Sequence, residues 1–178
     1  MRAQRERDYV DYVTGRLPVL RRVAMQLVGD PHRGDDLVQQ TITKLYARWS
    51  VAAEVDNLNA YVHRILVRVF LDERRLGWAA VRLGHIPSDT STAGPRESPA
   101  GSAVEDRLVL HAALAKLPPR QRAAVVLRYL ADHSVDEVAE ILGVSPGTVK
   151  SQTSDGHASL RRLLADQPAG PDLGVRHE

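Results

Sequence analysis

The sequence contains no cysteine. This absence excludes disulfide scaffolds, thiolate zinc sites, iron–sulfur clusters and cysteine nucleophiles, and it predicts indifference to a reducing cytoplasm. Aromatic residues are scarce as well, at 4% of the 178 residues, so a core must be mainly aliphatic. Hydrophobic residues still make up 43% of the chain, which is enough to build a folded core.

Long apolar runs are missing too. The longest unbroken one, Ala123–Leu127, is far too short to cross a bilayer. The first 13 residues lack the apolar segment that signal peptides carry. The 24 basic residues barely outnumber the 22 acidic ones, which excludes a polybasic tail protein but permits a DNA-binding face. We therefore expect a cytoplasmic protein without a membrane segment.

One stretch of the chain differs sharply in composition. Of the 22 residues from 82 to 103, 12 are Ser, Thr, Pro or Gly, and apolar residues do not recur there at a structural period. Such a segment cannot bury enough surface to offset its ordering entropy, which predicts a flexible linker. The sequence thus predicts a domain over residues 1–81, a linker over 82–103, a second domain over 104–166 and a tail over 167–178.

Both predicted domains are all-α. In the first, apolar residues spaced three and four apart indicate one helix that ends at Gly29-Asp30-Pro31. A second helix follows, then a loop over 50–57 and a third helix from about Asn59. In the second domain, the sequence pattern predicts helices over 104–116 and 120–130, followed by two short helices. No strand-like alternation of useful length is present.

The two short helices carry the strongest signal. Ser134 and Glu137 form a capping-box pattern, and Gly143 can end the helix that they open. Ser145 can then cap the next helix, from which Val149 reaches back to the first. This arrangement is typical of a helix-turn-helix that places its second helix in the major groove of DNA. An ordinary αα-hairpin is the alternative, and it explains fewer of these features.

The exposed face of the second helix carries groups that can bind base edges or phosphates. Asp155 is unfavourable there because it is an anion near phosphates, and Gly156 costs the helix about 1 kcal/mol relative to alanine. Three arginines on the preceding segment can either clamp phosphates or form a solvated face: Arg120, Arg122 and Arg128. The predicted reading residues are Thr148, Lys150, Ser151, Gln152, Ser154, His157 and Arg161.

Two stretches, GDDLVQQTITKLYARW and LPPRQRAAVVLRYLADHSVDEVAEILGVSPGTVKSQTSDGHASLRRLL, resemble the extracytoplasmic-function (ECF) sigma factors of the sigma-70 family. The KSQ-x-S-x-G pattern is most similar to the actinobacterial SigE-like group. The resemblance covers about residues 8–80 and 104–165. It implies a sigma region 2-like bundle and a sigma region 4-like helix-turn-helix domain. Together they direct core RNA polymerase to promoters and assist promoter melting, and an anti-sigma factor is a possible further partner.

The resemblance also implies where the partners bind. The helix that contacts the clamp helices of the polymerase β′ subunit corresponds to Asp35, Asp36, Gln39, Gln40 and Lys44. The second domain would dock on the β flap and read the −35 element through the face described above. The −10 element would be bound by the third helix and the loop before it, through Asn57, Asn59, His63, Arg64, Arg68 and Arg75.

The residue pattern of that helix supports DNA binding independently of the resemblance, although only for some of its residues. Arg64, Arg68 and Arg75 are spaced by four and seven residues, so they share one face, which suits a separated DNA strand. Exposed arginines that only solubilise the helix are the alternative. His63 can stack on an unpaired base, whereas Tyr61 and Phe70 are expected in the core.

Two other functions compete with this interpretation. A stand-alone helix-turn-helix regulator would bind a two-fold symmetric site without polymerase, but the GDDLVQQT helix and the lack of an obvious pocket argue against it. An enzyme is the second alternative. The seven histidines show no metal-ligand spacing, and the sequence has no phosphate-binding glycine loop and no nucleophile elbow. We expect no catalysis, no metal and no cofactor.

Overall fold

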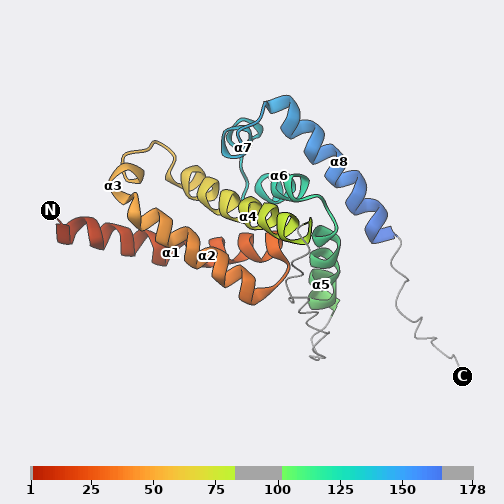
Figure 1. Cartoon of the computed structure of the whole chain (residues 1–178), viewed down its shortest axis with the longest axis horizontal. Helices are drawn as coiled ribbons and strands as arrows, with labels where there is room; N and C mark the ends of the chain where they lie inside the picture. Colours follow the sequence, from red (N-terminus) through yellow and green to blue (C-terminus); the bar gives the residue numbers. More distant parts are fainter. Residues whose placement is uncertain (1, 83–101, 166–178) are drawn as a thin grey trace, which may run out of the picture.

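The structure, a computed structural model, describes residues 2–82 and 102–165. Every regular element in these two ranges is a helix, in agreement with the all-α prediction (Figure 1). The first domain consists of α1 (Arg2–Val28), α2 (Pro31–Ala47), α3 (Trp49–Ala52) and α4 (Leu58–Arg82). The second consists of α5 (Ser102–Ala115), α6 (Pro119–Tyr129), α7 (Val135–Leu142) and α8 (Pro146–Ala165).

The first helix ends where the sequence predicts, at Gly29-Asp30-Pro31. Gly29 adopts a φ of +78°, which ends α1, and the Asp30 side chain accepts a hydrogen bond from the Arg33 amide at 2.8 Å to cap α2. Pro31 takes the first helical position, where no amide donor is needed. The apolar stripes of α1, α2 and α4 meet in a core whose fully buried members include Leu27, Leu37 and Leu66.

The stretch predicted as a loop over 50–57 is helical in its first part. The short α3 forms there because Trp49 is buried against aromatic rings of α1. Tyr9 lies edge-on to Trp49, with 5.3 Å between ring centroids, and its hydroxyl donates to the Ile42 carbonyl at 2.8 Å. Four of the scarce aromatic residues are therefore concentrated at this junction of α1, α2 and α3, and local propensity alone does not reveal it.

In the second domain, Gly156 permits close packing of α8 on α6. A Cβ atom built on Gly156 would lie only 2.6 Å from Cγ2 of Val125. The glycine that the sequence predicts to weaken the helix is thus required by the tertiary structure, because the contact leaves no room for a methyl group. α8 is continuous over 20 residues in spite of it.

We expect Gly156→Ala to lower the free energy of unfolding by about 1–2 kcal/mol, because overpacking against Val125 outweighs the gain in helix propensity. Urea denaturation measures the effect. Gly15→Ala in α1 is the matched control, since nothing lies within 4 Å of its added Cβ, and it should stabilise by about 0.5–1 kcal/mol. Adding Val125→Ala should recover part of the loss. Equal gains from both glycine substitutions would contradict the packing argument.

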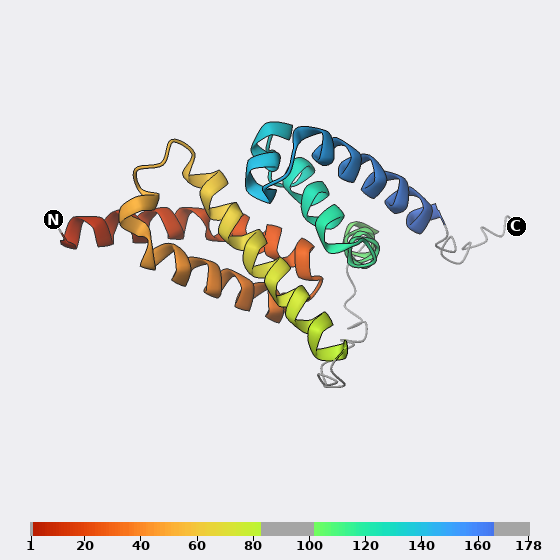
Figure 2. The same ribbon diagram turned by 45° about the horizontal axis from the view of Figure 1, so that its top comes forward.

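The two domains pack against each other. α1 and α4 of the first domain lie against α5, α6 and α7 of the second (Figure 2). A single cluster of buried apolar residues runs through both domains. α4 ends at Arg82 and α5 begins at Ser102, so the remainder of the predicted linker, residues 83–101, lies outside the described residues, as does the predicted tail over 167–178.

Candidate nucleic-acid interface

The turn between α7 and α8 has the predicted helix-turn-helix chemistry. The Ser134 hydroxyl accepts from the Glu137 amide at 3.1 Å, and the Glu137 carboxylate accepts from the Ser134 amide at 2.7 Å. Gly143 ends α7 with a φ of +65°, in the left-handed region. Ser145 caps α8 by accepting from the Thr148 amide at 3.1 Å, and Val149 is fully buried against α7 and α6. These contacts confirm the helix-turn-helix.

One face of α8 is open to solvent. Lys150, Ser151, Ser154, His157 and Arg161 are exposed, and Thr148 and Gln152 are partly exposed. The amide oxygen of Gln152 is turned inward and buried, so this side chain must rotate outward to pair with a base. Because a capped and packed helix holds these side chains, their spacing is fixed before any ligand arrives. Two of the shorter ones are engaged locally: Thr148 shares a hydrogen bond with Ser145 at 2.9 Å, and Ser151 donates to the Thr148 carbonyl at 3.0 Å.

Beside this face, α6 contributes Tyr129 and Arg128. The Tyr129 ring packs on His157 of α8, with 4.6 Å between centroids, and the Arg128 guanidinium lies 5.9 Å from the Tyr129 ring centroid. Arg120 is exposed, as a phosphate-binding arginine would be. Arg122 is not: it is 2% exposed, so the expectation that it clamps phosphates or forms a solvated face is wrong.

The residues predicted for the −10 element, on α4 and directly before it, fall into three groups. Arg68 and Arg75 are exposed. In contrast, three others contact the second domain: Asn57 Nδ2 donates to Glu137 Oε1 at 2.7 Å, Arg64 Nη2 donates to the Glu140 carbonyl at 2.9 Å, and His63 pairs with His133. Asn59, at the start of α4, accepts a hydrogen bond from the Tyr12 hydroxyl at 3.0 Å.

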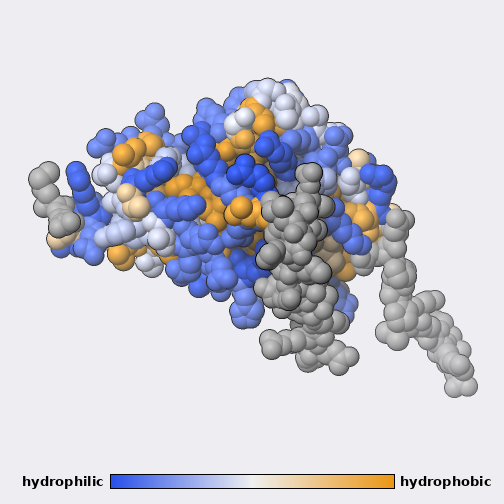
Figure 3. Space-filling model, viewed as in Figure 1, coloured by the Kyte–Doolittle hydropathy of each residue, from blue (hydrophilic) through white to orange (hydrophobic). Residues whose placement is uncertain are grey.

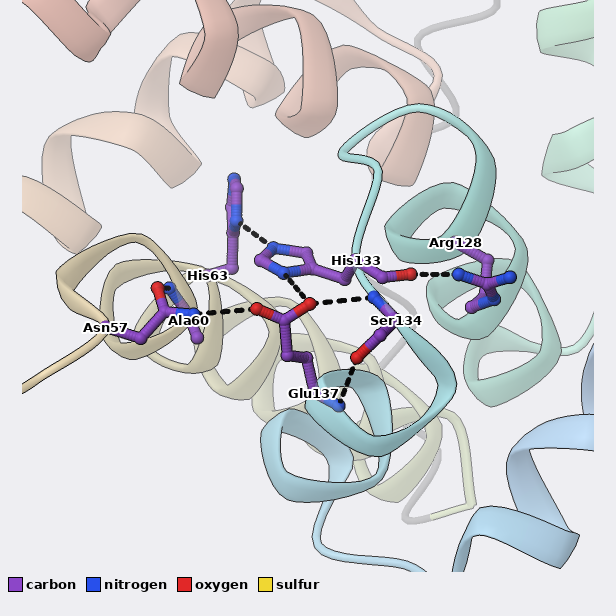
Figure 4. A network of polar contacts seen from close by, with 7 residues as sticks. All are labelled: Asn57, Ala60, His63, Arg128, His133, Ser134 and Glu137. Atoms are coloured by element: carbon purple, nitrogen blue, oxygen red, sulfur yellow. Dashed lines mark hydrogen bonds and ion pairs between the residues drawn. The ribbon is translucent and has the colours of Figure 1, made fainter.

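The histidine pair lies at the centre of this contact (Figure 4). Nδ1 of His63 and Nε2 of His133 are 2.6 Å apart, and both side chains are buried, at 6% and 5% exposure. Burial lowers the pKa of His63 to about 4, assisted by the nearby His133 and Arg16. Burial also lowers the pKa of His133, although Glu137 and Asp132 oppose this shift. Both rings are therefore neutral at pH 7.

Sequence reasoning missed the partners in this network. His133, Glu137 and Glu140 carry no signal for a contact with α4, because the residues that meet are 70 to 80 positions apart in the chain. Glu137 is recognisable only as a capping residue, a role that it also fulfils. Hydrogen bonding to the Ser134 amide is the main reason why the pKa of Glu137 is lowered.

The side chains predicted to contact polymerase share the outer surface of α2. All five are exposed: Asp35, Asp36, Gln39, Gln40 and Lys44. Two have neighbours within the domain, since Arg21 pairs with Asp35 at 3.0 Å and Gln40 donates to Glu73 at 2.7 Å. Apolar surface is visible near α3, which follows α2 (Figure 3). Val51 of α3 is 62% exposed.

Within residues 2–82 and 102–165, no three His, Asp or Glu side chains are grouped so that they could hold a metal ion. None of the helices in these ranges is long and apolar enough to span a membrane.

The fold and this surface define a two-domain helical DNA-binding protein with a helix-turn-helix in its second domain. Residues 13–67 match the family described as the Sigma2 domain of PhyR, and residues 107–158 match Sigma-70, region 4. RNA polymerase sigma-E factor of Streptomyces coelicolor is 35% identical over 160 residues, which cover 88% of this chain and 86% of the relative. ECF RNA polymerase sigma factor EcfG of Rhodopseudomonas palustris is 32% identical over 170 residues, covering 93% and 92%.

A solved structure agrees with these relatives. The sigma factor RpoE in complex with the anti-sigma factor NepR, from Bartonella quintana, matches with a TM-score of 0.75 and 27% identity, over 90% of this chain and 99% of that one. The chain belongs to the ECF group of RNA polymerase sigma factors. It therefore directs RNA polymerase to promoters, and the alternative of a stand-alone helix-turn-helix regulator is excluded.

Proposed function

We propose that the open face of α8 reads the −35 element of the promoter. The observation that carries this proposal is the exposure of Lys150, Ser151 and Ser154 on a recognition helix that is capped by Ser145 and anchored by Val149. A helix of this kind enters the major groove with its N-terminal half, where amide, hydroxyl and ammonium groups bind base edges and phosphates. His157 and Arg161 follow on the same face and would contact the backbone.

The −10 element is assigned to α4 and the loop before it. Arg68 and Arg75 are exposed and suit contacts to the phosphates of a separated strand. Asn57, His63 and Arg64 are occupied by the second domain, so their use on DNA requires that α7 first moves away. Asn59 adjoins them at the start of α4, where a flipped base would be captured.

The core polymerase is assigned to α2. Asp36 and Gln39 are exposed, and no other described side chain forms a hydrogen bond or ion pair with their side chains, so both are available to a partner. The apolar surface of α3 follows the C-terminal end of the same helix and can become buried in an extended contact, as the cores of protein interfaces do. The second domain would dock separately on the β flap.

Three further assignments complete the proposal. The chain acts in the cytoplasm, where the polymerase is, without a cofactor and without catalysing a reaction of its own. An anti-sigma factor is the expected inhibitor, because the similar RpoE of Bartonella quintana was solved with one.

Run-off transcription with purified core polymerase tests the function. Adding this chain should give transcripts that start at one position of a cognate promoter, and core polymerase alone should give none. The competing mechanism is tested by a DNA-binding assay without polymerase. Tight binding of a dimer to a palindromic site, together with failure to associate with core polymerase, would contradict the proposal.

Gln152→Ala should relax the preference at one base pair of the −35 element at a cost of about 1–3 kcal/mol, because a glutamine amide pairs bidentately with adenine. Run-off transcription from promoters substituted at each −35 position measures the preference. Ser159→Ala, two turns further along α8, is the control and should leave it unchanged. If Gln152→Ala keeps the full preference at every position, Gln152 does not read a base.

A further inference from the structure

We propose that His63 and His133 form an acid-sensitive latch that holds the second domain of this sigma factor against α4 at neutral pH and releases it when the pair takes up protons. The latch itself rests only on the contacts between the domains. Its consequence for DNA binding rests on the function proposed above, because closure occupies Asn57, His63 and Arg64.

The geometry of the pair requires that its rings be neutral or share protons. Two ring nitrogens 2.6 Å apart can hold one hydrogen between them but not two. Nδ1 of His133 lies 3.6 Å from Glu137 Oε2, which favours a hydrogen on that nitrogen. His133 Nε2 then accepts from Nδ1–H of His63. This arrangement leaves Nε2 of His63, on the far side of its ring, with a lone pair (Figure 4).

That second nitrogen is where the first added proton would bind. Nε2 of His63 is buried and has no hydrogen-bond partner among the described residues. The ring borders a cavity of about 210 Å³ between the domains, which apolar side chains such as Val19 and Leu20 line together with polar and charged ones such as Arg16 and Asp132. A proton on this buried atom creates an imidazolium whose new N–H has no acceptor among the described residues. A second proton, on His133 Nε2, places two hydrogens between the paired nitrogens and breaks their bond.

The charged groups around the pair come from α1, α6, α7 and the turn before α7. Arg128 of α6 donates to the backbone carbonyl of His133. Arg16 of α1 opposes protonation of His63. Asp132, in the turn before α7, and Glu137 of α7 favour protonation of His133, but desolvation is the larger effect. Tyr12 of α1 also borders the cavity as a neutral phenol. The balance still favours the neutral rings, which agrees with the pKa of about 4 for His63.

The sign of the pH effect follows from this balance. An opened domain exposes both histidines to water, where the pKa is about 6.5, so the open form binds more protons than the closed one. The free energy that favours the closed form is therefore greatest above pH 6.5, and it decreases as the pH falls from 6.5 toward 4. His63 contributes a decrease approaching tenfold per pH unit in the ratio of closed to open molecules, and His133 adds to it in the same direction.

Two other titrating groups lie at the interface. The pKa of Glu137 is lowered chiefly by the amide of Ser134, the cap of α7, a bond that does not depend on closure. Burial also lowers the pKa of His111 of α5, which pairs with Gln26 of α1 at 2.7 Å, so His111 adds to the effect with the same sign. It is only half-buried, however, and pairs with an amide instead of a second imidazole. It therefore provides the matched control for the buried pair.

The test follows domain closure directly by fluorescence energy transfer. Because the chain has no cysteine, Ser50→Cys in α3 and Ala158→Cys in α8, both at exposed positions, accept a donor and an acceptor dye. Between pH 7.5 and pH 5, the transfer efficiency of the full chain should fall while the helical content, followed by circular dichroism, stays constant. Constant efficiency over this range, or loss of helix in parallel with it, would overturn the latch.

Two variants identify the groups responsible. His63→Gln combined with His133→Gln removes both titrating rings but keeps hydrogen-bonding side chains, so its transfer efficiency should change far less between pH 7.5 and pH 5 than that of the parent chain. His111→Gln should retain most of the parent response, because His111 is less buried than the pair. An unchanged response in the double variant, or its loss in His111→Gln, would assign the effect to other groups and overturn the proposal. Neither result would affect the run-off transcription test, so failure of the latch is distinguishable from failure of the proposed function.

Arg16→Ala tests the electrostatic contribution to the latch without changing either histidine. Removing this positive charge eases protonation of His63 in the closed form, so the domains should stay closed to a lower pH. A shift of the opening toward higher pH would contradict the electrostatic part of the latch.

Discussion

Arg122→Met is expected to lower the free energy of unfolding by about 3 kcal/mol or more. The Arg122 guanidinium donates to the carbonyl of Leu27 at 2.6 Å, to that of Leu117 at 3.1 Å, and to that of Ala115. These carbonyls lie at the C-terminal ends of α1 and α5, where the helix dipoles concentrate negative charge. Methionine fills much of the same volume but leaves the acceptors without a donor, at roughly 1–3 kcal/mol each.

Arg122 is suited to this position because a guanidinium presents several donors in one plane. Phe70 of α4 lies beside it, with 5.9 Å from the guanidinium carbon to the ring centroid. Burial lowers the pKa of Arg122 to about 10, so it remains charged at pH 7. The bond to Leu27 joins residues 95 positions apart and therefore ties the second domain to the first.

Urea denaturation of the full chain measures the Arg122 effect. Arg120→Met, an exposed arginine on the same helix, is the matched control and should change the stability by less than about 0.5 kcal/mol. Arg122→Lys should fall between Arg122→Met and the parent chain, because an ammonium keeps the charge but cannot match the planar set of donors. Similar stabilities for Arg122→Met and Arg120→Met would show that the carbonyl clamp is not important for folding.

The double substitution Asp36→Ala plus Gln39→Ala should reduce transcription in the run-off assay by tenfold or more. Both side chains project from α2 into solvent, so their loss removes groups that the partner would contact, without disturbing the core. A tenfold loss corresponds to about 1.4 kcal/mol of binding free energy, which a few lost polar contacts at an interface can account for.

The control for this variant is Gln4→Ala plus Asp8→Ala. It removes the same two residue types from exposed positions of α1, where, among the described residues, their side chains bond to each other and to Arg7. It should transcribe normally, and both double variants should retain their helical content and stability. Normal initiation by Asp36→Ala plus Gln39→Ala would remove α2 from the polymerase contact.

Local chemistry made much of this fold predictable. The caps at Ser134 and Ser145 and the turn at Gly143 involve residues no more than a few positions apart, so the sequence shows them directly. The helix-turn-helix and its outward face follow from the same short spacings. Where the prediction was wrong, at α3 and at Arg122, the cause was contact with residues far away in the chain.

By itself, then, the sequence determined the helices, their caps and the polar face of α8, because hydrogen bonds within a helix and its first turn depend on neighbouring residues. Only the tertiary structure decided that Gly156 is a packing contact, that Arg122 bridges two helix ends, and that His63 meets His133. Such contacts join side chains that only the packing of separate helices brings within reach. A few such contacts between distant residues hold the two domains together, and no local sequence pattern predicts them.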